Sequence, residues 1–181
     1  MPTKTAAKKQ VLKQPTAALS IADRTAAKRA ARDTCLLANN WKKAGRTPII
    51  AIVTADAETK MLSSLREACK HLAVYVIEID TVDAAGITAA DIAIFPTVNL
   101  AAGRSAATAL AAGTVPVMTA SIAPKDIATD YDPVSEAGNS FFAADESVWG
   151  LLAALIRATE SYRFSYDWQG ITRAAFEATK K

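Results

Sequence analysis

The chain has 181 residues, a length that suits one domain of ordinary size rather than two. Hydrophobic residues make up 51% of it and charged residues 22%, a mixture too apolar for a disordered protein. No segment reaches the roughly 18 uninterrupted apolar residues that a membrane-spanning helix needs. The first twenty residues also lack the apolar centre of a secretory signal, so we expect a folded cytoplasmic protein with no membrane partner.

The net charge of +3 is distributed unevenly along the chain. Residues 1–48 carry eleven basic and two acidic side chains, whereas residues 49–181 carry ten and sixteen. A basic arm is typical of proteins that bind nucleic acid or another polyanion. This segment has a single aromatic residue, Trp41, and no recognisable nucleic-acid module, so a solvated tail and a basic helix face are the favoured interpretation.

Residues 1–17 are rich in Lys, Ala and Thr and predict a flexible basic tail. Residues 18–181 are predicted to form a single Rossmann-like domain. Within it, residues 20–46 form a basic amino-terminal helix capped by Ser20, and residues 47–181 hold the sheet core and the carboxyl-terminal helices. The apolar side of the basic helix is expected to comprise Ile21, Ala27, Ala31, Leu36 and Leu37, with Gly45 as its stop.

Strand and helix patterns alternate repeatedly after Pro48. The strands are short, continuous apolar runs rich in β-branched residues, as in strands that are covered on both faces. Because parallel strands need crossover helices, the alternation predicts an α/β fold with a mainly parallel sheet, in the order 2-1-3-4 with a short strand at the edge. The predicted strands are 49–54, 74–79, 92–95, 115–118 and 140–142, and the predicted helices after them are 57–72, 101–112, 145–161 and 168–179.

Ligands of open parallel sheets bind at the carboxyl ends of the strands, which here lead into loops 54–60, 96–105 and 119–126. The second loop runs into a helix whose predicted opening residues, Gly103, Arg104 and Ser105, would offer backbone N–H groups, a guanidinium and a hydroxyl to a phosphate. Simple helix initiation is the commoner meaning of such residues, and Lys60 taken alone is a solvated helix lysine.

The sequence offers few catalytic groups. His71, the only histidine, is expected at the end of a helix, and Asp130 and Asp132 are interpreted as a polar turn before Pro133 rather than an acid/base pair. The Gly-rich nucleotide motifs, the P-loop and the hydrolase elbow are absent. We therefore predict no catalytic residue, no metal and no cofactor, and we expect Cys35 and Cys69 to be buried or half-buried free thiols.

The segment GTVPVMTASIAPKDIATDYDP, residues 113–133, resembles the carboxyl-terminal, donor-binding half of bacterial glycogen and plant starch synthases, glucosyltransferases of the two-Rossmann-domain GT-B type. The likeness extends back through ITAADIAIFPT (87–97) and forward through GNSFF (138–142) as far as residue 159, and residues 1–45 lie outside it. It implies a GT-B carboxyl-terminal fold and a sugar nucleotide or nucleoside diphosphate as ligand. Catalysis in these enzymes takes place in a cleft between two domains, and this chain would supply only one side of that cleft.

The resemblance assigns donor or phosphate binding to Lys60, Gly103 and Ser105, which match family positions, and Arg104 adds a charge where the family is usually apolar. Other donor positions depart from the family. Leu100 stands at the donor-binding glutamate, Ala55 at a diphosphate-binding arginine, and Ile122-Ala123 replaces a Gly-Gly pair.

Three hypotheses follow from this mixture of matches and departures. The first is a synthase-like donor domain without glucosyl transfer of its own, acting as a nucleotide- or phosphate-binding or assembly module. The second is an active half of a split glucosyltransferase that uses ADP-glucose or UDP-glucose with a separate acceptor-domain chain. The third is an interaction scaffold that meets a protein partner, or a second copy of itself, through the basic helix.

Overall fold

The computed structural model describes residues 20–42, 46–80, 82 and 84–180. The predicted tail, 1–17, and the predicted helix stop at Gly45 lie outside the described residues. None of the helices in the described part is long and apolar enough to cross a membrane.

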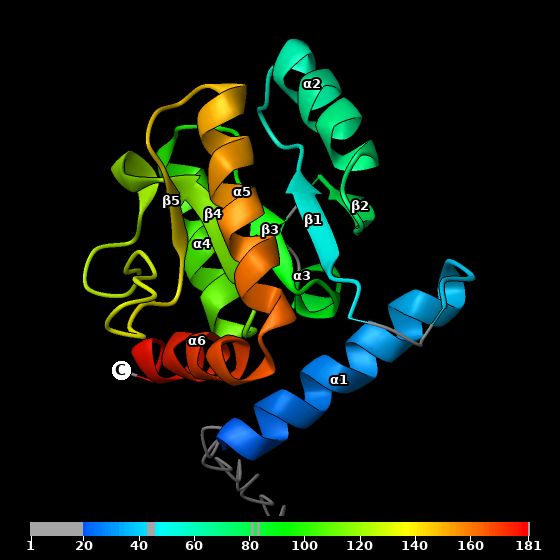
Figure 1. Ribbon diagram of the computed structural model, residues 1–181, viewed down its shortest axis with the longest axis vertical. Coiled ribbons are helices and arrows are strands. Elements are labelled where there is room, and N and C mark those ends of the chain that lie inside the picture. Colours follow the sequence, from blue (N-terminus) through cyan, green and yellow to red (C-terminus); the bar gives the residue numbers. More distant parts are fainter. Residues whose placement is uncertain (1–19, 43–45, 81, 83, 181) are drawn as a thin grey trace, which may run out of the picture.

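One sheet of five parallel strands forms the centre of the molecule (Figure 1). Its order is β2-β1-β3-β4-β5, which confirms the predicted order and the predicted edge strand. The fold class predicted from the alternating pattern is therefore confirmed as Rossmann-like α/β. The strands are β1 (Ile49–Val53), β2 (Tyr75–Ile79), β3 (Ile92–Ile94), β4 (Val115–Thr119) and β5 (Phe141–Ala143).

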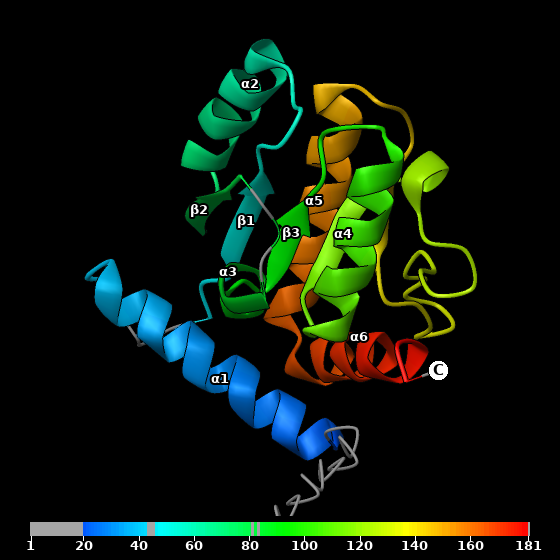
Figure 2. The same ribbon diagram turned by 180° about the vertical axis from the view of Figure 1, so that it is seen from behind.

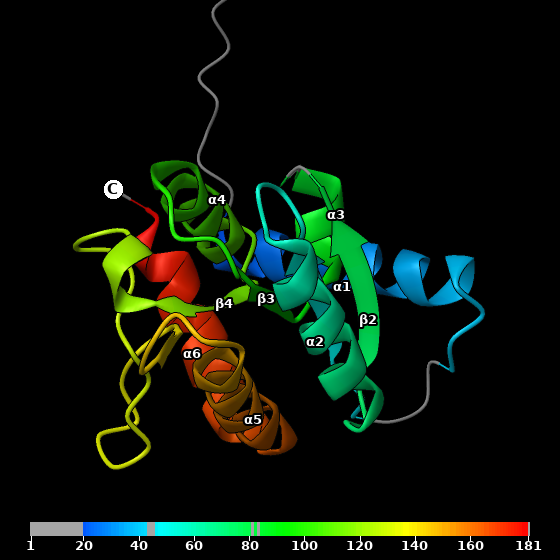
Figure 3. The ribbon, with the colours of Figure 1, turned by 90° about the horizontal axis from the view of Figure 1, so that it is seen from above.

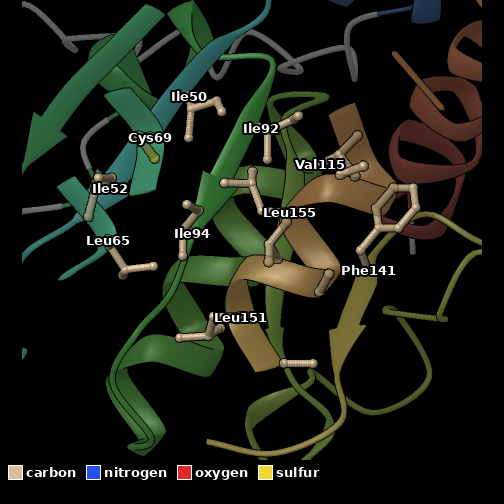
Figure 4. Close-up of a cluster of buried hydrophobic side chains, with 14 of the residues drawn as sticks. Ile50, Ile52, Leu65, Cys69, Ile92, Ile94, Val115, Phe141, Leu151 and Leu155 are labelled. Carbon is tan, nitrogen blue, oxygen red and sulfur yellow. The ribbon is translucent and has the colours of Figure 1, made fainter. Parts of the chain in front are cut away.

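Helices cover both faces of the sheet (Figures 2 and 3). Because side chains alternate along a strand, Ile50 and Ile52 of β1 meet α2 and α5 on one face (Figure 4), whereas Ile49 and Ala51 meet α1, α3 and α4 on the other. Both faces of the central strands are therefore buried from solvent, which explains their unbroken apolar sequence. The helices are α1 (Ile21–Ala38), α2 (Thr59–Lys70), α3 (Ala84–Ala89), α4 (Leu100–Ala111), α5 (Val148–Arg163) and α6 (Ser165–Ala178).

Helix α1 is shorter than predicted, because it ends at Ala38 rather than at residue 46. Asn40 has a φ of 55°, its N–H donates to the Leu37 carbonyl, and the Trp41 N–H donates to the Leu36 carbonyl. This pattern is a Schellman cap, in which an asparagine takes the left-handed position that glycine usually fills. Trp41, just beyond the cap, stacks on Tyr75 of β2 at 4.5 Å between ring centroids, so it serves the packing of the domain.

The buried side of α1 also differs from the prediction. Leu36 is buried as expected, but Leu37 is 76% exposed and Ala27 is exposed. Lys28, which was not among the residues expected on the buried side, is buried instead. Its ammonium group donates to the Ala90 carbonyl at 2.5 Å and to the Thr114 hydroxyl at 3.0 Å, so a lysine takes the place that an apolar residue was expected to fill.

The two carboxyl-terminal helices begin at different residues from those predicted. Helix α5 starts at Val148, three residues after the predicted start, because the Ser147 hydroxyl accepts the Gly150 N–H and caps the helix there. Helix α6 starts at Ser165, before the predicted 168, and lies across the amino ends of the strands beneath α4 and α5 (Figures 1 and 2).

The remaining single-residue predictions agree with the structure. His71 is the exposed C-cap of α2, Cys35 is half-buried and Cys69 is buried, where desolvation raises the pKa of its thiol to about 11. Asp132 accepts hydrogen bonds from the Val134 N–H and the Ser135 hydroxyl within a turn, and Asp130 binds the Phe142 N–H and Arg157. Both aspartates therefore serve the polar turn that the sequence predicts.

Tyr131, between these aspartates, gives a first testable prediction. Its side chain is 3% exposed, and within the described residues its hydroxyl has no hydrogen-bond partner. Removal of an unsatisfied buried hydroxyl relieves its desolvation cost, so Tyr131→Phe is expected to raise the free energy of unfolding by about 1 kcal/mol. The measurement is urea unfolding at neutral pH. Tyr162→Phe is the matched control, because the Tyr162 hydroxyl accepts from Arg32 at 3.4 Å and its removal is expected to lower stability.

Candidate functional site

The loops that follow β1 and β3 meet at the carboxyl edge of the sheet. The Thr97 hydroxyl donates to the Ala55 carbonyl at 3.0 Å, and the Asn99 amide donates to the Asp56 carboxylate at 3.3 Å. The chain crosses from one side of β1 to the other between β2 and β3, so this edge is the switch point of the sheet. Open α/β sheets bind ligands at such a point.

Asn99 fixes the start of α4. Its side-chain oxygen accepts the Ala102 N–H at 2.7 Å, and its carbonyl accepts the Gly103 N–H at 3.4 Å. The helix therefore begins at Leu100, one residue before the predicted start at residue 101, and Gly103, Arg104 and Ser105 lie inside it. The backbone N–H groups without an intrahelical acceptor belong to residues 100–102, so the free N–H groups expected at residues 103–105 are not found there. Phosphate binding by these residues stays a prediction.

Gly103 has a packing role in this structure. A Cβ atom built on it would lie 2.8 Å from the carbonyl oxygen of Ile122, in the short 3-10 helix η1 (Ala120–Ile122). A side chain at this position would therefore push α4 away from the segment that follows β4. Close approach of two backbones explains the glycine without any ligand.

The four predicted binding residues do not converge in one pocket. Ser105 lines a small cavity of about 40 Å³ together with Ala55, Asp56, Thr97 and Asn99 among others. Arg104 is exposed on α4, and Lys60 is exposed in the first turn of α2. Lys60, Gly103 and Arg104 are not part of the cavity lining. Both helices nevertheless start at the same edge of the sheet (Figures 1 and 2).

The size and charge of this edge limit its chemistry. A cavity of about 40 Å³ is close to the volume of a single water molecule and far below the several hundred Å³ of pockets that enclose organic ligands. Asp56 places a carboxylate beside Asn99, which suits a sugar hydroxyl better than a phosphate. The edge is therefore an open surface that needs a second wall to enclose a nucleotide.

Sequence reasoning missed Asp56, Thr97 and Asn99. Asn99 did carry a signal, because asparagine is a preferred N-cap and the alanine-rich helix follows it directly. Asp56 and Thr97 had no such signal. Their positions depend on two loops that are separated by more than forty residues in the sequence and are adjacent only in the fold.

No family model matches the chain. Glycogen synthase 1 of the cyanobacterium Synechocystis sp. is 26% identical over 132 residues, which are 72% of this chain and 28% of that protein. The solved structure of the catalytic domain of Starch Synthase IV from Arabidopsis thaliana, bound to ADP and acarbose, superposes with a TM-score of 0.62 at 18% identity, over 88% of this chain and 39% of that one. The chain thus resembles part of a glycogen or starch synthase.

The synthase-like domain has the α/β fold of a GT-B glycosyltransferase, with a helix before its first strand. The predicted likeness to glycogen and starch synthases is thereby confirmed. The chain spans well under half of the length of either relative, so their activities describe proteins considerably longer than this one.

Proposed function

We propose that this synthase-like domain is a nucleotide- or phosphate-binding module that does not transfer glucosyl groups on its own. The observation that carries the proposal is the contact between the β1 and β3 loops at the switch point, where Ser105 lines a cavity and the starts of α2 and α4 bring Lys60 and Arg104 to the same edge. Starch Synthase IV, the structural relative, was solved with ADP bound.

Binding at this edge is expected to be weak. The helix start at Leu100–Ala102 contributes roughly 0.3 to 1 kcal/mol to the binding of an anion, and Lys60 and Arg104 act through solvent. We expect ADP to bind with a dissociation constant on the order of millimolar, a free energy of about −4 kcal/mol, and more weakly at high salt. Titration of ADP followed by backbone amide chemical shifts measures this.

The titration has a clear expected pattern. The amides of Ala101, Ala102 and Ser105 should shift, and Lys60→Ala should weaken the binding. Lys42→Ala should leave the binding unchanged, because it removes an exposed lysine next to Trp41, which stacks on the start of β2 at the opposite end of the sheet. If these amides stay in place at saturating ADP, the proposed binding site is wrong.

Catalysis is expected to be absent in the isolated domain. Leu100 and Ala55 carry no charge at positions where the synthases bind the donor, and the open edge provides no second wall around a nucleotide. Loss of a charged partner leaves a diphosphate without its charge-assisted hydrogen bonds. Incubation with labelled ADP-glucose or UDP-glucose and glycogen should therefore give no incorporation. Incorporation that Ser105→Ala or Lys60→Ala abolishes would instead support an active half of a split glucosyltransferase.

A further inference from the structure

A much larger cavity lies at the opposite end of the sheet, between α1 and α6. Its volume is about 620 Å³, within the range of pockets that bind small organic molecules. Asp91, directly before β3, and Lys28, bonded to the residues before β3 and β4, place it at the amino ends of the strands. We call this cavity the α1–α6 cleft. It shares no lining residue with the small cavity at the carboxyl edge.

The charged side chains on the floor of the cleft already have hydrogen-bond partners. Arg32 donates to the Asp91 carboxylate at 3.1 Å and to the Thr47 carbonyl at 2.8 Å. Lys28 is surrounded by the Ala90 carbonyl and the Thr114 hydroxyl. These hydrogen bonds hold α1 against the sheet, and they satisfy the polar groups of the floor without a ligand.

The rim of the cleft differs from the floor, because its cations lack acidic partners. Arg29 of α1 and Arg173 of α6 line the cleft, and neither forms an ion pair or hydrogen bond within the described residues. Arg46 donates to the Arg163 carbonyl, which leaves its positive charge unneutralised. The single carboxylate on the rim, that of Asp33, is engaged in an interaction of its own. Three guanidinium groups thus give the rim a net positive charge, and their planar forks match a phosphate.

The walls add two further features. Trp168 of α6 lines the cleft and packs edge-on against Tyr162, another lining residue, with 5.0 Å between ring centroids. Phe176 also lines the cleft but is only 1% exposed. Ser165, the first residue of α6, also lines it, and Phe164 gives that helix start no side-chain cap. An uncapped helix start favours an anion, and aromatic walls favour an apolar or planar group. The cleft therefore suits a ligand that carries both an anionic group and an apolar or planar group.

The chain's own amino-terminal residues do not suit this cleft. Residues 1–19 contain four lysines and no acidic residue, so their charge repels that of the rim. From the free arginines, the aromatic walls and the volume we propose that the α1–α6 cleft binds a small phosphate ester with an apolar or planar substituent, at a site separate from the edge proposed for nucleotides.

Phenyl phosphate is the simplest probe of that chemistry, with inorganic phosphate as the comparison that lacks the ring. Titrated into the full chain, phenyl phosphate should shift the amides of Thr25, Arg29, Gln169 and Thr172 and the indole N–H of Trp168. It should bind about tenfold more tightly than inorganic phosphate because the ring buries apolar surface. Equal affinity of the two probes would overturn the proposal.

Charge-matched variants locate the site. Arg29→Gln and Arg173→Gln, both at exposed positions, should each weaken the binding of phenyl phosphate several-fold, whereas Lys125→Gln, which removes one charge far from the cleft, should not. Urea unfolding of each variant shows whether it is folded. Equal weakening by all three variants would show a diffuse effect of net charge and would overturn the site. Shifts confined to Ala101, Ala102 and Ser105 would place the phosphate at the other edge, in favour of the proposed function and against this cleft.

Discussion

Asp91→Asn is expected to lower the free energy of unfolding by about 3 to 5 kcal/mol, because it leaves a partly buried arginine without its counter-charge. Asp91 is 4% exposed, and one of its carboxylate oxygens accepts both the Ile49 N–H at 2.9 Å and the Arg32 guanidinium at 3.1 Å. Asparagine keeps a similar shape and an acceptor, so the variant isolates the charge. The measurement is the urea unfolding midpoint at neutral pH.

Asp130→Asn is a closely matched control. Asp130 also binds a strand N–H, that of Phe142, and pairs with an arginine, Arg157, at 3.1 Å. The side chains of this pair are 40% and 44% exposed, so solvent screens both charges and the expected loss is at most about 1 kcal/mol. Equal losses at the two sites would show that burial of Asp91 and Arg32 adds nothing to their interaction.

Asp91 also shows why part of the fold follows from local sequence and part does not. The strands were predictable because runs such as IIAIV and IAIF are continuously apolar and are bounded by residues such as Pro48 and Pro96, which is enough to indicate a parallel sheet covered on both faces. Their order depended on the crossover rules for parallel strands. The pairing of Asp91 with Arg32 joins residues 59 apart, and neither residue carries a local signal of it.

Three of the misplaced helix boundaries lie at a polar residue that ends or caps the helix. Asn40 ends α1, Asn99 begins α4 and Ser147 begins α5, and each of these polar residues was passed over in favour of a glycine or an apolar pattern. At α4 the predicted start was one residue late, and the free backbone N–H groups expected at residues 103–105 lie instead at residues 100–102. The capping preferences of asparagine and serine would have corrected all three boundaries.

The α1–α6 cleft could not be predicted from the sequence, for a different reason. Its arginines lie on helices at opposite ends of the chain, and Arg29 and Arg173 are each typical of a solvated helix face. Only the packing of α1 and α6 across the same end of the sheet brings them together (Figures 1 and 2). Lys28 was hidden in the same way, because its partners belong to the turns before β3 and β4.

Lys28 leads to a prediction on how stability depends on pH. Burial lowers the pKa of Lys28 from 10.5 to about 8, against the opposing influence of Asp91, which raises it. In the unfolded chain the same lysine keeps its proton up to about pH 10.5. Between pH 8 and 10.5 the unfolded state therefore binds more protons than the folded state, and the contribution of Lys28 to stability rises with pH across this window and is constant below it.

Lys28→Met removes this titration and retains an unbranched side chain of similar length. In this variant the single proton of the Thr114 hydroxyl still reaches the Ile87 carbonyl at 2.6 Å or the Ala90 carbonyl at 2.8 Å, so the hydroxyl keeps a hydrogen-bond partner. The unfolding free energy of the parent minus that of Lys28→Met should stay constant between pH 6 and 7.5. It should then increase by about 3 kcal/mol on going to pH 10.5, which is the free energy of the lowered pKa.

Urea unfolding of both proteins at a series of pH values measures that difference, and the subtraction cancels the tyrosines and cysteines that titrate in the same window. Lys125→Met is the control, because an exposed lysine should give a difference that does not change with pH. A constant difference for Lys28→Met would mean that Lys28 keeps its proton in the folded state to the same pH as in the unfolded state. The bonds to the Ala90 carbonyl and the Thr114 hydroxyl would then compensate fully for its burial.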